Sequence, residues 1–309
     1  MVQPLPVSHF AIRFGKKKNT LELSWQGKED PLEPTAKPRE YIVYTRIGRG
    51  GFDNGVRVSS PFHTVKIEPG IVYSFKVTAV NRGGESFPSE ILAAYKAKRE
   101  KGQILIVNGF DRISGPAVID TPETVGFDLS QDPGVPYLYD ISLCGTQQNF
   151  NRKEAGKRLG ESREEYEGMK IIGNTFDYPF IHGKAIQAAG NYSFVSCSDE
   201  AVEKGILSLE DYPIVDYILG LEKRRQFQQS GTQYILQDIL LIHAALLASY
   251  CRSGGNLLVS GAYVGSDMDN SQGNRDFIQN ILKYRYGNSL KTDGDKIAVQ
   301  GLGRTFTLP

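Results

Sequence analysis

The stretch VYSFKVTAVN, residues 72–81, alternates apolar and polar side chains from Tyr73 to Ala79 and is the clearest strand in the sequence. Such alternation is typical of a strand that buries one face and exposes the other. Shorter segments of the same kind precede it at 21–25 and 41–44, between clusters of Gly, Pro and Asn. Residues 10–95 therefore predict an all-β unit of short strands.

This unit resembles a fibronectin type III domain. Trp25 lies on an early strand, Tyr73 precedes the alternating positions, and NRGGESFPSE follows at 81–90. In that family the tryptophan fills the core, the tyrosine forms a corner hydrogen bond, and a similar turn leads into the last strand. The resemblance implies a fibronectin type III sandwich over residues 1–97.

A different pattern begins after the charged segment YKAKREKG at 95–102. We interpret 98–102 as a linker, which predicts that the parts on its two sides unfold separately. Apolar runs then occur at 103–107, 192–195, 214–219 and 256–260. Such runs are typical of strands buried on both faces of a parallel sheet. Residues 103–309 therefore predict a three-layer α/β domain with a mostly parallel sheet.

Helix signals lie between these runs. Asp199 is placed to cap a helix over 200–204, and Thr232 to cap a long helix that ends before Gly254. A further helix is expected at 181–189. Residues 111–180 carry several prolines and fit the alternation poorly, which indicates a long insertion over the edge of the sheet.

Composition excludes several classes of function. Lys and Arg number 36 against 35 Asp and Glu. This nearly neutral chain has no strong positive electrostatic field to attract a polyanion, so nucleic acid is not an expected partner. No apolar run reaches the ~20 residues of a membrane span. The start of the chain lacks the pattern of a signal peptide, so we expect either a cytoplasmic protein or a piece of a longer exported one. No dinucleotide or P-loop fingerprint follows a strand, so no cofactor is predicted.

The residues that follow each strand are candidates for chemistry, because open parallel sheets bind ligands at the carboxyl ends of their strands. Asn108 and Asp111 follow the first strand, Glu222 follows the third, and Asp267 and Asp269 follow the fourth. We predict that the carboxylates share one acidic rim. Each also has a structural interpretation, as a cap, a loop closure or a solvated group. No histidine is near them in sequence and the three cysteines are scattered, so no metal site is predicted.

The segment GGNLLVSGAYVG at 254–265 resembles the nucleophile elbow of class I glutamine amidotransferase-like domains, which have a flavodoxin-like fold. That family has Gly-x-Cys-x-Gly after the strand, and here Tyr263 stands where the cysteine would be. Because the unperturbed pKa of tyrosine is about 10, the resemblance implies a domain without its nucleophile. A degenerate domain of this kind occurs inside some β-galactosidases.

His182 lies at the junction of a loop and a helix and is the histidine nearest to the predicted rim. Its structural interpretation is a capping or solvated side chain. A triad of Ser260, His182 and an acid is a further hypothesis, whose alternative is that Ser260 packs beneath a helix. His243, inside an apolar helix, is interpreted as a core histidine.

Three segments, VNGFDR at 107–112, VDYILGLE at 215–222 and GNLLVSG at 255–261, resemble bacterial exported multidomain proteins, many from Bacteroidetes. In these a fibronectin type III module precedes such an α/β domain, beside golvesin- or xanthan-lyase-like domains. The resemblance implies a secreted, periplasmic or cell-surface location and a carbohydrate or cell-envelope polymer as partner. It also implies additional domains in the full-length protein, of which this chain would be an internal fragment.

Two functions are compatible with these patterns. The first is a non-catalytic or degenerate module of an exported polysaccharide- or cell-envelope-processing protein. The alternative is a polysaccharide hydrolase or lyase with an acidic/Tyr cleft at the carboxyl ends of the α/β strands. Its catalytic groups would be Asp111, His182, Glu222 and Tyr263, and its ligand contacts Asn108, Ser260, Asp267 and Asp269.

Overall fold

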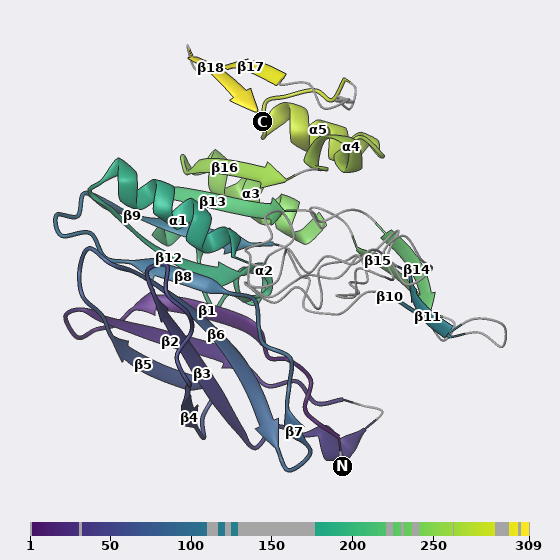
Figure 1. Ribbon diagram of the computed structural model, residues 1–309. Coiled ribbons are helices and arrows are strands. Elements are labelled where there is room, and N and C mark those ends of the chain that lie inside the picture. The colour runs from purple at the N-terminus through teal and green to yellow at the C-terminus, as the bar shows by residue number, and fades with distance from the viewer. Residues whose placement is uncertain are drawn as a thin grey trace, which may run out of the picture.

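The chain begins with antiparallel strands and continues into parallel ones (Figure 1). The computed structural model describes residues 2–30, 33–109, 177–220, 243–261 and 263–287 with their side chains. It describes the backbone alone of residues 117–120, 125–128, 225–229, 232–236, 241–242, 297–301 and 304–308.

The antiparallel strands form a fibronectin type III-like β fold, as the sequence predicts. β1 pairs with β2 and β2 with β5, while β8, β6, β3 and β4 pair in that order and β7 pairs with β6. A short 3₁₀ helix, η1 (Pro34–Ala36), precedes β3. The strands are β1 (Ser8–Phe14), β2 (Thr20–Gln26), β3 (Glu40–Ile47), β4 (Val56–Val58), β5 (Phe62–Lys66), β6 (Val72–Asn81), β7 (Gly84–Glu85) and β8 (Leu92–Tyr95).

Two residues of the family pattern have their expected roles. Trp25 is 3% exposed and meets the rings of Phe10 and Tyr41 edge-on, at centroid distances of 6.3 and 5.5 Å. The hydroxyl of Tyr73 accepts a hydrogen bond from the backbone N–H of Glu68 at 3.1 Å. The predicted core tryptophan and corner hydrogen bond are therefore both confirmed.

The parallel strands lie where the apolar runs predict them. In the order β12, β9, β13, β16 each pairs in parallel with the next. They are β9 (Gly102–Asn108), β12 (Tyr192–Ser198), β13 (Ile214–Gly220) and β16 (Asn256–Gly261). The helices are α1 (Tyr178–Ala189), α2 (Asp199–Glu203), η4 (Leu209–Asp211), α3 (Leu241–Arg252), α4 (Val264–Met268) and α5 (Gln272–Asn280).

Three hairpins accompany these elements, and one of them corrects a sequence prediction. They are β10 (Ala117–Asp120) with β11 (Val125–Asp128), β14 (Arg225–Gln229) with β15 (Thr232–Leu236), and β17 (Ile297–Gly301) with β18 (Arg304–Leu308). Thr232 was predicted to cap a helix, but it begins β15, and α3 begins only at Leu241. The β-branched and aromatic residues of TQYIL favour a strand over a helix.

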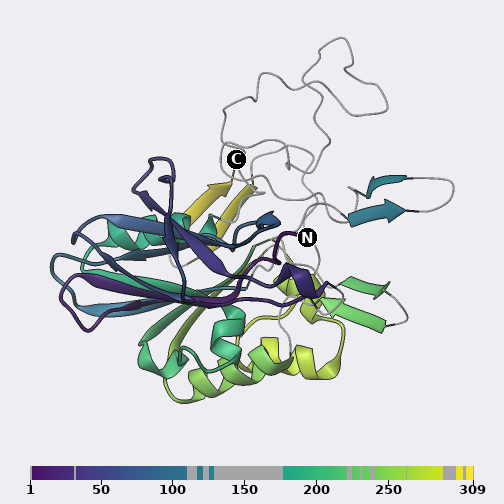
Figure 2. The ribbon, with the colours of Figure 1, turned by 90° about the horizontal axis from the view of Figure 1, so that it is seen from below.

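Helices α1 and α3 lie on opposite sides of the parallel strands (Figure 2). Ile104 and Ile106 of β9 share a hydrophobic cluster with Phe180 of α1. Leu105 of β9 belongs to a different cluster, together with Leu247 of α3. This division follows from the alternation of side chains along a strand. We call the side of the parallel strands that carries α1 the α1 face.

Strand β12 joins the two parts of the chain. It pairs in parallel with β9 and antiparallel with both β8 and β1. The hydroxyls of Ser193 and Ser196 add to this junction by accepting hydrogen bonds from the backbone N–H of Ala97 (2.9 Å) and Ala93 (2.8 Å). The result is one 12-stranded sheet and a hydrophobic cluster that runs from the sandwich to α5.

Residues 98–101 are solvent-exposed, as a linker would be. The strands on the two sides of this connection are nevertheless hydrogen-bonded through β12. This continuity favours joint unfolding of the two parts over the separate unfolding that a charged linker suggests.

A buried ion pair makes a second connection between the sandwich and α1. Arg46 of β3 is 1% exposed, and its Nη2 lies 2.5 Å from Oδ1 of Asp177, the N-cap of α1. The same nitrogen donates to the hydroxyl of Ser74 at 2.9 Å. The guanidinium also lies over the rings of Phe180 (4.6 Å) and Phe52 (5.1 Å). The start of α1 is thereby fixed on β3 and β6.

Candidate functional site

Two predicted ligand residues, Asn108 and Ser260, lie in one row across the carboxyl ends of the parallel strands. Asn108 pairs with Ile218 of β13, and Ile218 pairs with Ser260 of β16. Because Ile218 packs in the cluster of α1, this whole row lies on the α1 face. Asp216 and Leu258 occupy the neighbouring row on the same face.

His182 reaches this face from α1 and contacts Asp216. The His182 Nδ1 lies 2.7 Å from the Asp216 Oδ2, and Asp216 is only 5% exposed. The imidazole keeps 26% of its surface exposed, and within the described residues Nε2 takes part in no hydrogen bond. A carboxylate at Nδ1 selects the tautomer in which Nε2 is free to accept a proton. Such a pair has the geometry that general-base chemistry uses.

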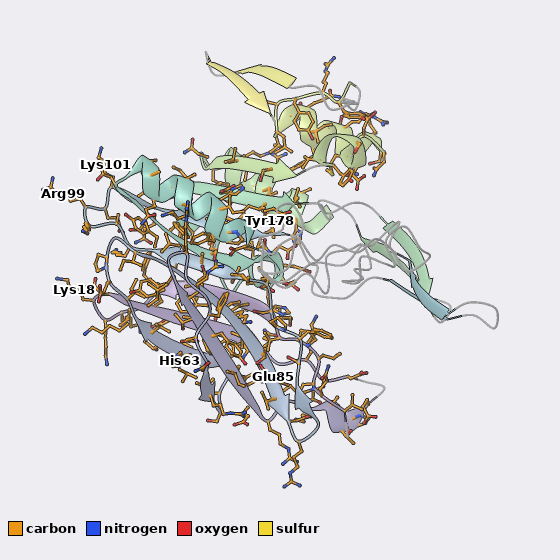
Figure 3. The ribbon with its side chains drawn as sticks, in the orientation of Figure 1. Lys18, His63, Glu85, Arg99, Lys101 and Tyr178 are labelled. Carbon is orange, nitrogen blue, oxygen red and sulfur yellow. The ribbon has the colours of Figure 1, made fainter. Side chains whose placement is uncertain are left out.

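A glycine allows α1 to approach the sheet closely enough for this contact. A Cβ on Gly183 would lie 2.1 Å from the ring of Phe194 in β12. A larger residue at position 183 would therefore force α1 or the Phe194 ring to move. Tyr178, the first residue of α1, and Lys101, which precedes β9, lie toward opposite ends of the strands (Figure 3). The first turns of α1, including His182, therefore lie near the carboxyl ends of the parallel strands.

Tyr263, the predicted elbow residue, lies between β16 and the short helix α4. β16 ends at Gly261, and Tyr263 is the N-cap of α4. A Cβ on Gly261 or on Gly265 would lie 2.8 Å from a neighbouring side chain, so the turn requires both glycines. Tyr263 is half-buried.

Asp267 and Asp269 belong to the local structure of α4. Asp267 is 8% exposed, and its backbone carbonyl accepts a hydrogen bond from the Asn270 side chain at 2.6 Å. The carboxylate of Asp269 lies 3.9 Å from the guanidinium of Arg275, which also donates to the Asp269 carbonyl at 3.1 Å. These contacts favour the structural interpretation of Asp269, as a residue that closes a loop.

Asp111 and Glu222 lie outside the described residues, and the acidic rim that includes them stays a prediction. Within the described part of the chain, no three His, Cys, Asp or Glu side chains are grouped so that they would hold a metal ion. In the same residues no helix combines the length and the apolar character needed to cross a bilayer.

A second group of titratable side chains lies on the face opposite α1, and the sequence did not predict it. His243 of α3 is 4% exposed, with Nδ1 3.1 Å from the Tyr217 hydroxyl and 3.5 Å from an oxygen of Asp199. Its Nε2 lies 3.8 Å from Glu203. Burial lowers the pKa of His243, although Glu203 and Glu200 act in the opposite direction. The burial agrees with a core histidine, whereas its carboxylate neighbours were not anticipated.

The thiols of the described residues are poorly suited to nucleophilic chemistry. Cys197 of β12 is fully buried, and burial, together with the charge of Asp199, raises its pKa well above the usual value. Burial also raises the pKa of Cys251 in α3. Because the thiolate is the reactive form, neither Cys197 nor Cys251 is suited to replace the nucleophilic cysteine whose position Tyr263 occupies.

Asp216 is the site residue that sequence reasoning missed. It interrupts the apolar run 214–219, which we interpreted only as a buried strand. A carboxylate inside such a run is itself informative, because Asp is almost never fully buried unless it has a partner. That signal marks Asp216 as a residue with a buried partner, although it does not identify the partner.

No family model and no curated protein matches. Similar solved structures include a myokine structure, at 16% identity and a TM-score of 0.26, with 30% of this chain and 98% of that chain covered. The solution structure of a human fourth FNIII domain has 18% identity and a TM-score of 0.26, covering 30% of this chain and 79% of its own. The titin kinase with its flanking domains has 23% identity and a TM-score of 0.25, covering 29% of this chain and 16% of its own.

These matches each cover less than a third of the chain. The fibronectin type III-like β fold of β1 to β8 is accordingly established by the strand pairing, the buried Trp25 and the hydrogen bond of Tyr73.

Proposed function

We propose that this chain is a non-catalytic or degenerate module of an exported polysaccharide- or cell-envelope-processing protein. In this proposal the parallel strands and their helices are an α/β three-layer domain of the glutamine amidotransferase-like class. The sandwich supports that domain through the shared sheet. The proposed partners are a carbohydrate or cell-envelope polymer and additional domains of the full-length protein.

The observation that carries this proposal is the position of Tyr263. Gly261 and Gly265 flank it with the spacing of an elbow, and a Cβ at either position would lie 2.8 Å from a neighbouring side chain. A phenol is a much poorer acyl nucleophile than the thiolate of a cysteine. The form of an amidotransferase site without its reactive group supports a role in binding.

Tyr263→Phe is therefore expected to leave both stability and polymer binding unchanged. Binding is measured by co-sedimentation with insoluble polysaccharides and peptidoglycan, and stability by urea unfolding. Gly265→Ala is the matched control, expected to lower stability because its Cβ would lie 2.8 Å from the ring of Tyr286. The proposal would be contradicted if the wild type degraded one of these polymers and Tyr263→Phe lowered that rate by ~10²-fold or more. A loss of that size is the scale of a positioned acid or base.

A second candidate function, a polysaccharide hydrolase or lyase, is favoured by the contact of His182 with Asp216. His182 is a predicted catalytic residue, and its imidazole is held by a buried carboxylate. Inverting hydrolysis and β-elimination both use a general base, which this imidazole would supply. The predicted contributions of Asp111 and Glu222 to such a cleft remain part of this hypothesis.

A further inference from the structure

We propose that Ser260, His182 and Asp216 form a triad that hydrolyses carboxylic esters, with acyl groups on a polysaccharide as the substrate class. The inference rests on the second candidate function and assigns it a nucleophile. It does not involve Tyr263 or the elbow.

Strand register places Ser260 within reach of the His182–Asp216 pair. Asp216 pairs with Leu258 of β16, and Ser260 is two residues farther along β16 on the same face. Adjacent strands lie about 4.8 Å apart, and residues two positions apart on a parallel strand lie about 6.6 Å apart, so the two positions are separated by about 8 Å. One imidazole with a hydrogen bond at each nitrogen spans such a gap, and the Asp216 bond, at 2.7 Å, is already formed. The His182 Nε2 is then the atom that would accept a hydrogen bond from the Ser260 hydroxyl.

The described residues leave this part of the α1 face open to a ligand. β16 is the terminal strand of the sheet, and Leu258, next to Asp216, is 56% exposed. Ser260 is half-buried, so it keeps part of its surface exposed. An acyl chain resting on Leu258 would bring its carbonyl to the neighbouring row, where Ser260 lies.

The burial of Asp216 is costly for a purely structural residue. Its neighbours on the α1 face include Ile106 and Ile218, and its Oδ1 has no hydrogen-bond partner among the described residues. Replacing a buried ion pair by apolar side chains is often neutral or stabilising. A carboxylate held in this position does, however, stabilise the imidazolium that forms when His182 takes a proton. The arrangement is better explained by proton transfer than by packing.

The reaction balances with water as the only co-reactant. The Ser260 Oγ attacks the ester carbonyl while its proton passes to the His182 Nε2. Collapse of the tetrahedral intermediate breaks the bond to the alkoxy oxygen, which leaves as the alcohol with that proton. Water then attacks the acyl-serine and gives a proton to Nε2, and this proton returns to the Ser260 Oγ as the carboxylic acid departs.

The test is hydrolysis of p-nitrophenyl acetate and release of acetate from an O-acetylated polysaccharide by the full chain. Ser260→Ala and His182→Ala are expected to lower kcat by at least ~10³-fold with folding intact. Asp216→Asn is expected to lower kcat by ~10²-fold or more with little change in KM, and to change the pH profile of kcat. Matched controls at sites outside the triad are Ser253→Ala, His63→Ala and Asp211→Asn, each expected to retain full activity.

A fluorophosphonate probe gives a readout that a structural role would not affect. It should label Ser260, with loss of fluoride, in the wild type but not in His182→Ala. Absence of ester hydrolysis by the wild type, or full activity in any triad variant, overturns the proposal. If glycosidic bonds of a polymer are nevertheless cleaved, the hydrolase function survives without this triad. If neither bond is cleaved, both fail.

Discussion

Arg46→Ala is expected to lower the free energy of unfolding by about 3–5 kcal/mol, the range for breaking a buried ion pair. Arg46 and Asp177 have side-chain exposures of 1% and 6%. Removing the guanidinium leaves a carboxylate without its charge partner, and it also removes the stacking on Phe180. Urea unfolding followed by circular dichroism measures the loss.

Arg57→Ala is the matched control, because Arg57 forms an ion pair with Glu40 whose side chains are 61% and 40% exposed. Surface pairs contribute at most about 1 kcal/mol. Asp177→Ala should resemble Arg46→Ala, and the double variant should lose less than the sum of the two. Equal effects of Arg46→Ala and Arg57→Ala would show that the buried pair does not connect the sandwich to α1.

Trp25→Ala is expected to destabilise the chain by about 3–5 kcal/mol, the range for large-to-small changes in a core. Trp25 contacts Phe10 and Tyr41 through its ring faces and edges, so alanine leaves a cavity bounded by rigid rings. Circular dichroism has to report the transition, because the chain has only 1 Trp and the variant has lost its fluorescence.

Trp25→Phe is the control for this change. It keeps an aromatic ring in the core and removes an indole Nε1 that has no hydrogen-bond partner among the described residues, so its loss should be clearly smaller. A destabilisation below ~1 kcal/mol in Trp25→Ala would mean that Trp25 is not the core residue of the sandwich.

Local patterns predicted the individual strands well. The alternation in 72–81 and the apolar run 103–107 depend on side chains that face one or both sides of a sheet, and both became strands at those positions. The predicted helix ends at Arg252 as expected, but its start at Thr232 was wrong. An apolar run suits a strand or a helix equally, and only β-branched and aromatic content separates them. That content marked 232–236 as β15.

Contacts between distant segments were not predictable in the same way. The pairing of β12 with β8 and β1 cannot be read from the local sequence of any of these strands. The charged linker suggested instead that the two parts of the chain unfold independently. Within the candidate site, the interruption of an apolar run by Asp216 was visible, but its partner His182 lies 34 positions away in the sequence. Only the fold brings the two together.

The central structural claim is that the sandwich and the site-bearing parallel strands form one unit through β12. Urea unfolding of the full chain tests it most directly, because the fluorescence of Trp25 reports on the sandwich and far-ultraviolet circular dichroism reports on helices α1 and α3. Shared hydrogen bonds and a continuous hydrophobic cluster predict one transition with the same midpoint for both signals. Two separate transitions, with the fluorescence of Trp25 still native after the helices have unfolded, would contradict the account.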